Sequence, residues 1–242
     1  MTRQDEFGRA LAGSQLQTQI YVNRRSDELS CSILATLNLG TPVGCAIDWK
    51  SPLEAKRFTE YRDADFLRVL GLDRLGAQLL DYWPTRGPVW DALATIRSDE
   101  TTLGYVLVEA KSYVGEMESD CKATSQASIS KIDAALKRTQ HWLGANQEID
   151  WKKGLYQSAN RLAHLYFLRE IAGLDAWLVN LCFVGDDPPR HTSPAEWRDG
   201  LAESKRRLGL PTTIPWVSEV LLPARRGDEL LAAKRRLPNL NL

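Results

Sequence analysis

The 242-residue chain is predicted to form an α/β domain in which a mixed β-sheet is flanked by helices. Three runs of apolar, β-branched and aromatic residues, at 89–97, 103–111 and 176–184, have the length and composition of buried strands. Segments with helical spacing stand before, between and after these runs, so we expect helices on both faces of the sheet. The length favours one domain over two, because a chain of this size can bury one large core.

The first 85 residues are predicted to be a helix-rich elaboration of the same domain, and residues 86–242 its sheet-bearing core. A Ser-Asp-Glu triplet at 26–28 and a Ser-Pro-Leu-Glu capping box at 51–54 mark helix starts. Between them, residues 45–49 have the character of a short extended segment. Helices are expected over 7–22, 26–37, 52–60, 63–71 and 73–82.

The runs at 89–97 and 103–111 are expected to pair, because only a short polar turn signal separates them. Further along the chain, capping residues and apolar spacing predict three helices and one more strand. The helices are expected over 124–143, 153–172 and 193–208, and the strand over 215–222.

The helix expected over 153–172 has an apolar side and a polar side. Leu155, Leu162 and Tyr166 should pack it on the sheet. The polar side recurs at spacings of three and four and consists of Gln157, Asn160, Arg161 and His164. Such a stripe suits a solvent-exposed helix face as well as a functional one, and a lone histidine in it is more typical of a structural role.

Charged residues interrupt both of the paired runs. Glu109 and Lys111 are two residues apart, so a strand places both side chains on one face and turns Ala110 to the other. Asp91 enters the first run just after Trp90, and pairing of the two runs can bring its carboxylate to the same place. Two acids and a lysine at the end of a buried sheet are costly to desolvate unless they coordinate a metal or pair with each other.

This arrangement resembles the active-site motif of the PD-(D/E)XK nuclease superfamily. Asp91 matches the first acid, and Glu109-Ala110-Lys111 matches the E-x-K, with seventeen residues between the two acids. In that family a proline usually precedes the aspartate, whereas here Trp90 does and the nearest proline is Pro88. The resemblance extends over roughly residues 86–184 and implies a restriction-endonuclease-like fold.

The resemblance also implies a chemistry. Asp91, Glu109 and the Ala110 carbonyl would bind Mg²⁺, for which Mn²⁺ can substitute, and Lys111 would orient or help deprotonate the attacking water. Related nucleases often place a polar residue of the following helix beside the metal, which makes Gln157 or Arg161 a candidate. The substrate that the resemblance implies is DNA. Glu116 is a spare acid near the proposed site, and it is more typical of a surface-loop carboxylate than of a ligand.

Two other interpretations stay open at this point. The chain can be a non-catalytic nucleic-acid-binding protein on the same fold, or an unrelated α/β protein in which Glu109 and Lys111 form a salt bridge at a sheet edge. Metal binding separates the nuclease from the unrelated protein, and cleavage separates the nuclease from the binder.

The composition narrows the functional class only slightly. The formal net charge is zero, so nucleic-acid binding would depend on clusters such as 205–207 and 234–236. The four cysteines lack C-x-x-C spacing, which argues against a zinc knuckle or an iron–sulfur cluster. Without a leader or an apolar run of membrane-spanning length, we expect a cytoplasmic protein with no membrane partner. A homodimer and a monomer are both open.

Overall fold

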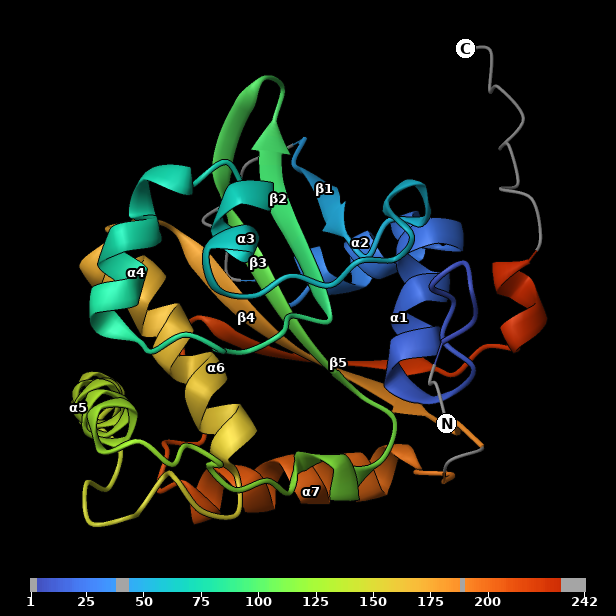
Figure 1. Cartoon of the computed structure of the whole chain (residues 1–242). Helices are drawn as coiled ribbons and strands as arrows, with labels where there is room; N and C mark the ends of the chain where they lie inside the picture. Colours follow the sequence, from blue (N-terminus) through green and yellow to red (C-terminus); the bar gives the residue numbers. More distant parts are fainter. Residues whose placement is uncertain (1–3, 38–43, 188–189, 232–242) are drawn as a thin grey trace.

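A five-stranded mixed sheet forms the centre of the computed structural model, which describes residues 4–37, 44–187 and 190–231 (Figure 1). The strand order is β1-β2-β3-β4-β5, with antiparallel pairing from β1 to β3 and parallel pairing from β3 to β5. The strands are β1 (Ala46–Ser51), β2 (Ala92–Ser98), β3 (Thr101–Lys111), β4 (Ala176–Val184) and β5 (Val217–Pro223). The expected α/β class with a mixed sheet of at least four strands is confirmed.

Seven α-helices accompany the sheet within the described residues. They are α1 (Gly13–Arg24), α2 (Ser26–Leu34), α3 (Asp63–Val69), α4 (Gly76–Tyr82), α5 (Gln126–Trp142), α6 (Tyr156–Tyr166) and α7 (Pro194–Arg207). Shorter turns are the 3₁₀ segments Glu54–Lys56, Asp73–Leu75, Val114–Met117 and Gly227–Leu230, and the π-helical turn Phe167–Ile171 after α6. The capping expected at the start of the helix over 193–208 is present in α7 as a capping box, in which the Ser193 and Glu196 side chains each accept the other's backbone N–H.

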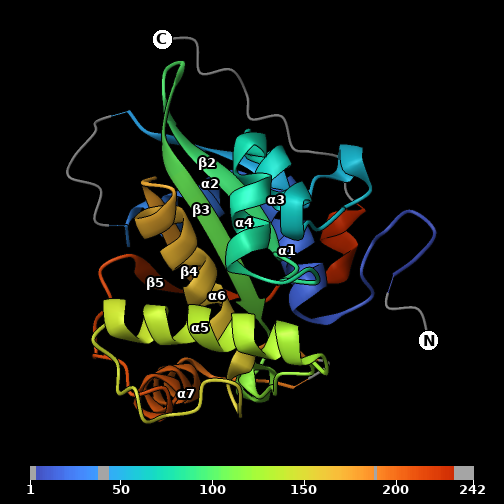
Figure 2. The same ribbon diagram turned by 60° about the vertical axis from the view of Figure 1, so that its left-hand side comes forward.

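Helices cover both faces of the sheet, because each strand alternates its side chains between two cores. In β3, Leu107 belongs to a core shared with α3 to α7, whereas Val106 and Val108 belong to a second core shared with α1 and α2. Figure 2 shows α4, α5 and α6 in front of the sheet and α1 and α2 behind it. The site described below lies on the face of Leu107.

Three expectations about elements before residue 100 were wrong in detail. The first helix begins at Gly13, and Phe7 and Leu11 are exposed rather than packed. The helix expected over 52–60 is a single 3₁₀ turn, because Arg57 and Phe58 adopt left-handed backbone conformations that no helix continues through. The strand expected from residue 89 begins at Ala92, since the backbone of Trp90 pairs with Tyr61 instead.

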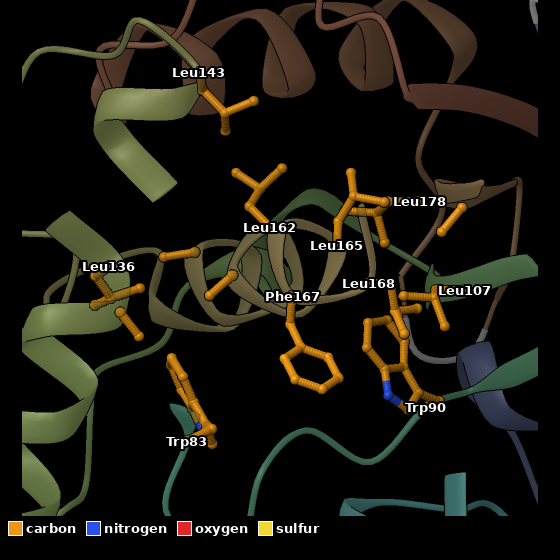
Figure 3. Packing of buried hydrophobic residues seen from close by; sticks show 14 of the residues in the cluster. Trp83, Trp90, Leu107, Leu136, Leu143, Leu162, Leu165, Phe167, Leu168 and Leu178 are labelled. Carbon is orange, nitrogen blue, oxygen red and sulfur yellow. The ribbon is translucent and has the colours of Figure 1, made fainter. Parts of the chain in front are cut away.

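The helix expected over 153–172 is α6 together with the π-helical turn that follows it. Leu155 and Leu162 are buried as expected, but Tyr166 stacks on Tyr82 of α4, with ring centroids 6.0 Å apart. Figure 3 shows Leu165 and Leu168 directed toward Leu178 and Leu107 of the sheet. The helix is therefore rotated about its own axis relative to the expected orientation, so that Leu165 and Leu168 face the sheet in place of Tyr166.

Candidate functional site

Strand β3 carries Glu109 and Lys111 at its carboxyl end. Leu107, two residues earlier, lies in the core on the same face, whereas Ala110 lies in the core on the other face. The period of two therefore directs both charged side chains toward α6. Glu109 is buried and Lys111 is partly buried, with side-chain exposures of 6% and 16%.

Asp91 lies beside this end of β3 because β2 starts one residue later. The last strand pair between β2 and β3 is Ala92 with Val108, so the backbone of Ala110 has no β2 residue opposite it. Instead the Ala110 N–H donates to Asp91 Oδ2 at 2.8 Å. In an extended strand the N–H and C=O of one residue lie on the same edge, so the Ala110 carbonyl also faces the edge where Asp91 lies.

Both carboxylate oxygens of Glu109 are engaged by cations. Lys111 Nζ lies 2.6 Å from Oε1, and Arg161 Nε donates to Oε2 at 2.5 Å. Lys111 Nζ also donates to Gln157 Oε1 at 3.2 Å. The structure thus brings Asp91, Glu109, Lys111 and Gln157 together around one end of the sheet.

Helix α6 supplies both polar partners because Gln157 and Arg161 are four residues apart and share one face. The helix start is fixed by Ser119, whose hydroxyl accepts the Gln157 N–H at 2.8 Å. Arg161 is buried, and its Nη2 donates to the Val89 carbonyl at 2.8 Å while its guanidinium lies over the Trp90 ring. The polar side of this helix therefore faces the site rather than solvent.

Glu60 is a third acid of this region, and no sequence pattern singles it out. The Trp90 N–H donates to the Tyr61 carbonyl in an antiparallel bridge, and this pairing brings residue 60 beside residue 91. Glu60 Oε1 accepts from Gln15 Nε2 at 2.9 Å. No spacing or motif links Glu60 to Asp91, because the bridge between Tyr61 and Trp90 joins segments that are far apart in the chain.

An open cleft of about 1750 Å³ runs past these side chains. Its walls come from the N-terminal segment, the loop 84–89, the end of β3, the segment 116–125 and α6. The acids that line it are Asp5, Glu60, Asp91, Glu109, Glu116, Glu118 and Asp120. The bases are Arg57, Arg86, Lys111, Lys122 and Arg161. Acids exceed bases, so the cleft by itself is more suited to a cation than to an anion.

The electrostatics of the two central acids differ. Burial, reinforced by the neighbouring Glu109 carboxylate, raises the pKa of Asp91 to about 8 against the opposing charge of Lys111. Burial also acts to raise the pKa of Glu109, but the charges of Arg161 and Lys111 outweigh it, and the net shift is downward. Burial raises the pKa of Glu60 as well. The site therefore holds more carboxylates than its cations neutralise.

The donor set fits a divalent cation in part. Asp91 Oδ1 has no hydrogen-bond partner among the described residues, and it lies on the edge where the Ala110 carbonyl faces. Against this, both Glu109 oxygens are occupied, and the described part of the chain contains no group of three His, Cys, Asp or Glu side chains arranged to hold a metal. A cation that binds Glu109 would therefore displace one of its two ion-pair partners, Lys111 or Arg161.

The other side chains singled out from the sequence have structural surroundings. His164 is buried against Phe66, Trp83 and Trp90, its Nδ1 lies 2.8 Å from the Asn160 carbonyl, and burial lowers its pKa to about 3. Glu116 accepts the Ser112 N–H at 2.7 Å on the cleft wall.

The four cysteines are free. Within the described ranges, no helix combines the length and apolar character that crossing a membrane requires.

Comparisons of the chain with protein families, with curated proteins and with solved structures give no match in any of the three.

Proposed function

We propose that the chain is a metal-dependent nuclease of the PD-(D/E)XK kind that hydrolyses phosphodiester bonds, with DNA as its substrate. The observation that carries the proposal is the convergence of Asp91, Glu109 and Lys111 at one end of the sheet, beside an open cleft. The arrangement of an antiparallel hairpin, a crossover with helices and a parallel strand supports a restriction-endonuclease-like fold. Residues 1–85 would then be an elaboration of the nuclease core.

Asp91, Glu109 and the Ala110 carbonyl would hold Mg²⁺, or Mn²⁺ in its place, because hard oxygen ligands suit both ions. When bound, such an ion stabilises the charge that develops on the phosphate oxygens. The pKa of Asp91, raised by burial and then by the neighbouring Glu109, supports this assignment, since a bound cation would favour the charged form of such a carboxyl group.

Lys111 serves the reacting atoms directly in this proposal. Its ammonium is fixed by Glu109 and by Gln157 Oε1, and an ammonium has three N–H donors, so one remains for a phosphate oxygen or the attacking water. Gln157 positions the Lys111 ammonium by accepting one of its hydrogen bonds. Arg161 is a positioning residue, because it ties Glu109 to the Val89 carbonyl, two residues before Asp91.

A non-catalytic nucleic-acid-binding protein on the same fold is the second candidate. The observation that favours it is the double ion pair of Glu109, which satisfies that carboxylate without any metal. Divalent-cation binding and cleavage distinguish the two candidates.

The test is incubation of the purified protein with linear, circular and single-stranded DNA and with RNA, under Mg²⁺ and under Mn²⁺. We expect cleavage by the wild type and its loss in Asp91→Ala, Glu109→Ala and Lys111→Ala, because the three act as one assembly. Asp133→Asn is the matched control, since Asp133 pairs with Lys152 outside the cleft.

Calorimetry with Mn²⁺ separates the roles. Affinity should survive Lys111→Ala, which removes no ligand, and collapse in Asp91→Ala and Glu109→Ala. A wild-type protein that neither binds a divalent ion nor cuts any of these nucleic acids would favour the non-catalytic binder. Undiminished cleavage by Glu109→Ala would show that the active site lies elsewhere.

A further inference from the structure

Two of the cations on the cleft wall are free to meet a ligand. Lys111 and Arg161 are held by Glu109, and Arg57 donates to the backbone carbonyl of Glu6. The side chains of Arg86 and Lys122 are exposed, and neither has a hydrogen-bond or ion-pair partner among the described residues. They come from separate segments, the loop before β2 and the segment before α5.

The loop that carries Arg86 is held in a fixed and costly conformation. Arg86 has φ 68, in the left-handed region that favours glycine over residues with a Cβ. The Asp63 carboxylate stabilises this turn by accepting the Arg86 N–H at 3.1 Å and the Gly87 N–H at 2.8 Å. Since glycine would adopt this backbone more easily, Arg86→Gly can remove the side chain without straining the loop.

The charge of the cleft explains what these cations would do. Its acids exceed its bases, and the nucleic-acid backbone is itself anionic, so binding needs cations that the protein's own acids do not neutralise. Arg86 precedes Asp91 by five residues, in the loop that Arg161 anchors through the Val89 carbonyl. Its place relative to the acids is therefore fixed.

We propose that Arg86 and Lys122 bind backbone phosphates of a nucleic-acid strand in the cleft and so position it against Asp91 and Glu109. This inference rests on the proposed function and deepens it, because it assigns the phosphate contacts that the paired residues of the site cannot supply. Arg86 offers a planar fork that suits a phosphate, and Lys122 offers a point charge.

The test measures binding of a fluorescent single-stranded oligonucleotide by anisotropy in EDTA, over a range of salt concentrations, for the wild type, Arg86→Gly and Lys122→Ala. Each variant should bind about fivefold to tenfold more weakly, and the slope of log affinity against log salt should fall by about 0.7 for the lost contact. Arg86→Gly should melt at the same temperature as the wild type or higher, because it relieves the backbone while removing the side chain.

Two control variants separate these effects. Asp99→Gly relieves a left-handed residue in the β2–β3 turn, away from the cleft, and Arg138→Ala removes an exposed arginine of α5 that does not line it. Both should leave affinity within about twofold of wild type. If the wild type cleaves, Arg86→Gly should raise KM with little change in kcat.

Unchanged affinity and salt slope in both Arg86→Gly and Lys122→Ala would overturn the inference, as would a wild type that binds no nucleic acid. A wild type that binds with these dependences but does not cleave would leave the phosphate contacts in place and overturn the nuclease proposal. Losses of equal size in Arg138→Ala would show a diffuse charge effect and overturn the specific contacts.

Discussion

Two acids near the end of β3 have opposite surroundings. Asp186 is buried on the α1 side, and both of its oxygens are satisfied by neutral donors, Ser112 Oγ at 2.5 Å and Gln17 Nε2 at 3.1 Å. One oxygen of Asp91 accepts the Ala110 N–H, and the other has no partner among the described residues. The carboxylate of Glu109 lies close enough to raise the pKa of Asp91 further. A closed set of hydrogen bonds stabilises a fold, whereas an open set of like charges costs stability and is a mark of function.

The largest expected effect of this difference is that a substitution at Asp91 lowers activity without lowering stability. Asp91→Asn should reduce cleavage on the order of 10³-fold or more, because it removes a member of the concerted assembly. The same change should leave the thermal midpoint unchanged or raise it, since it replaces a carboxyl group whose charged form burial and the neighbouring Glu109 both disfavour. Cleavage assays and calorimetry on one preparation check this. A marked loss of stability would show that Asp91, like Asp186, is structural.

The next largest effect should be stabilisation by divalent cations, which should depend on Asp91 and not on Asp186. If Asp91 and Glu109 bind Mn²⁺, a concentration of 100 times the Kd should stabilise the wild type by about 2.7 kcal/mol. The stabilisation should vanish in Asp91→Asn and persist in Asp186→Asn. Thermal melts with Mn²⁺ and with EDTA measure it, and equal shifts in all three proteins would indicate binding elsewhere.

Asp186→Ala should behave in the opposite way from Asp91→Asn. It leaves the Ser112 hydroxyl without its acceptor and removes one of the two acceptors of the Gln17 amide, which should cost about 1–3 kcal/mol of unfolding free energy. Asp186→Asn keeps the volume and one acceptor, so it should cost less. Urea denaturation measures both. A fully stable Asp186→Ala protein would show that the network on this side is dispensable.

His164 should give the smallest effect at neutral pH, because its contribution to stability changes only when the pH falls below 6.5. The folded protein holds His164 neutral down to a pKa of about 3, whereas the unfolded chain protonates it near 6.5. Its contribution to stability is therefore fully present above pH 6.5 and is lost as the pH falls toward 3, by about 1.4 kcal/mol per pH unit. His164→Gln should show a shallower decline over that range. Parallel curves for the two proteins would contradict the neutral, buried histidine.

Local patterns in the sequence predicted the sheet and the E-x-K strand well. Alternation placed Glu109 and Lys111 on one face, and helical spacing placed Gln157 and Arg161 together. The same patterns could not reveal Glu60, since its approach to Asp91 depends on a bridge between Tyr61 and Trp90.

Periodicity also could not show that Arg161 is buried, because polar residues have the same helical spacing whether their side of the helix faces water or a functional site. The missing helix over 52–60 has a comparable cause, the left-handed backbone of Arg57 and Phe58.

The chain order of the site has a consequence for how the protein folds. Asp91 and Glu109 belong to one hairpin, β2–β3, whose contacts are local, whereas Arg161 and Gln157 lie in the long crossover that must be placed before β4 can pair with β3. Local pairings close sooner than those that span a long loop. We therefore expect Asp91, Glu109 and Lys111 to be brought together before Arg161 arrives, so the docking of α6 would add the second cation to an already assembled pair of acids.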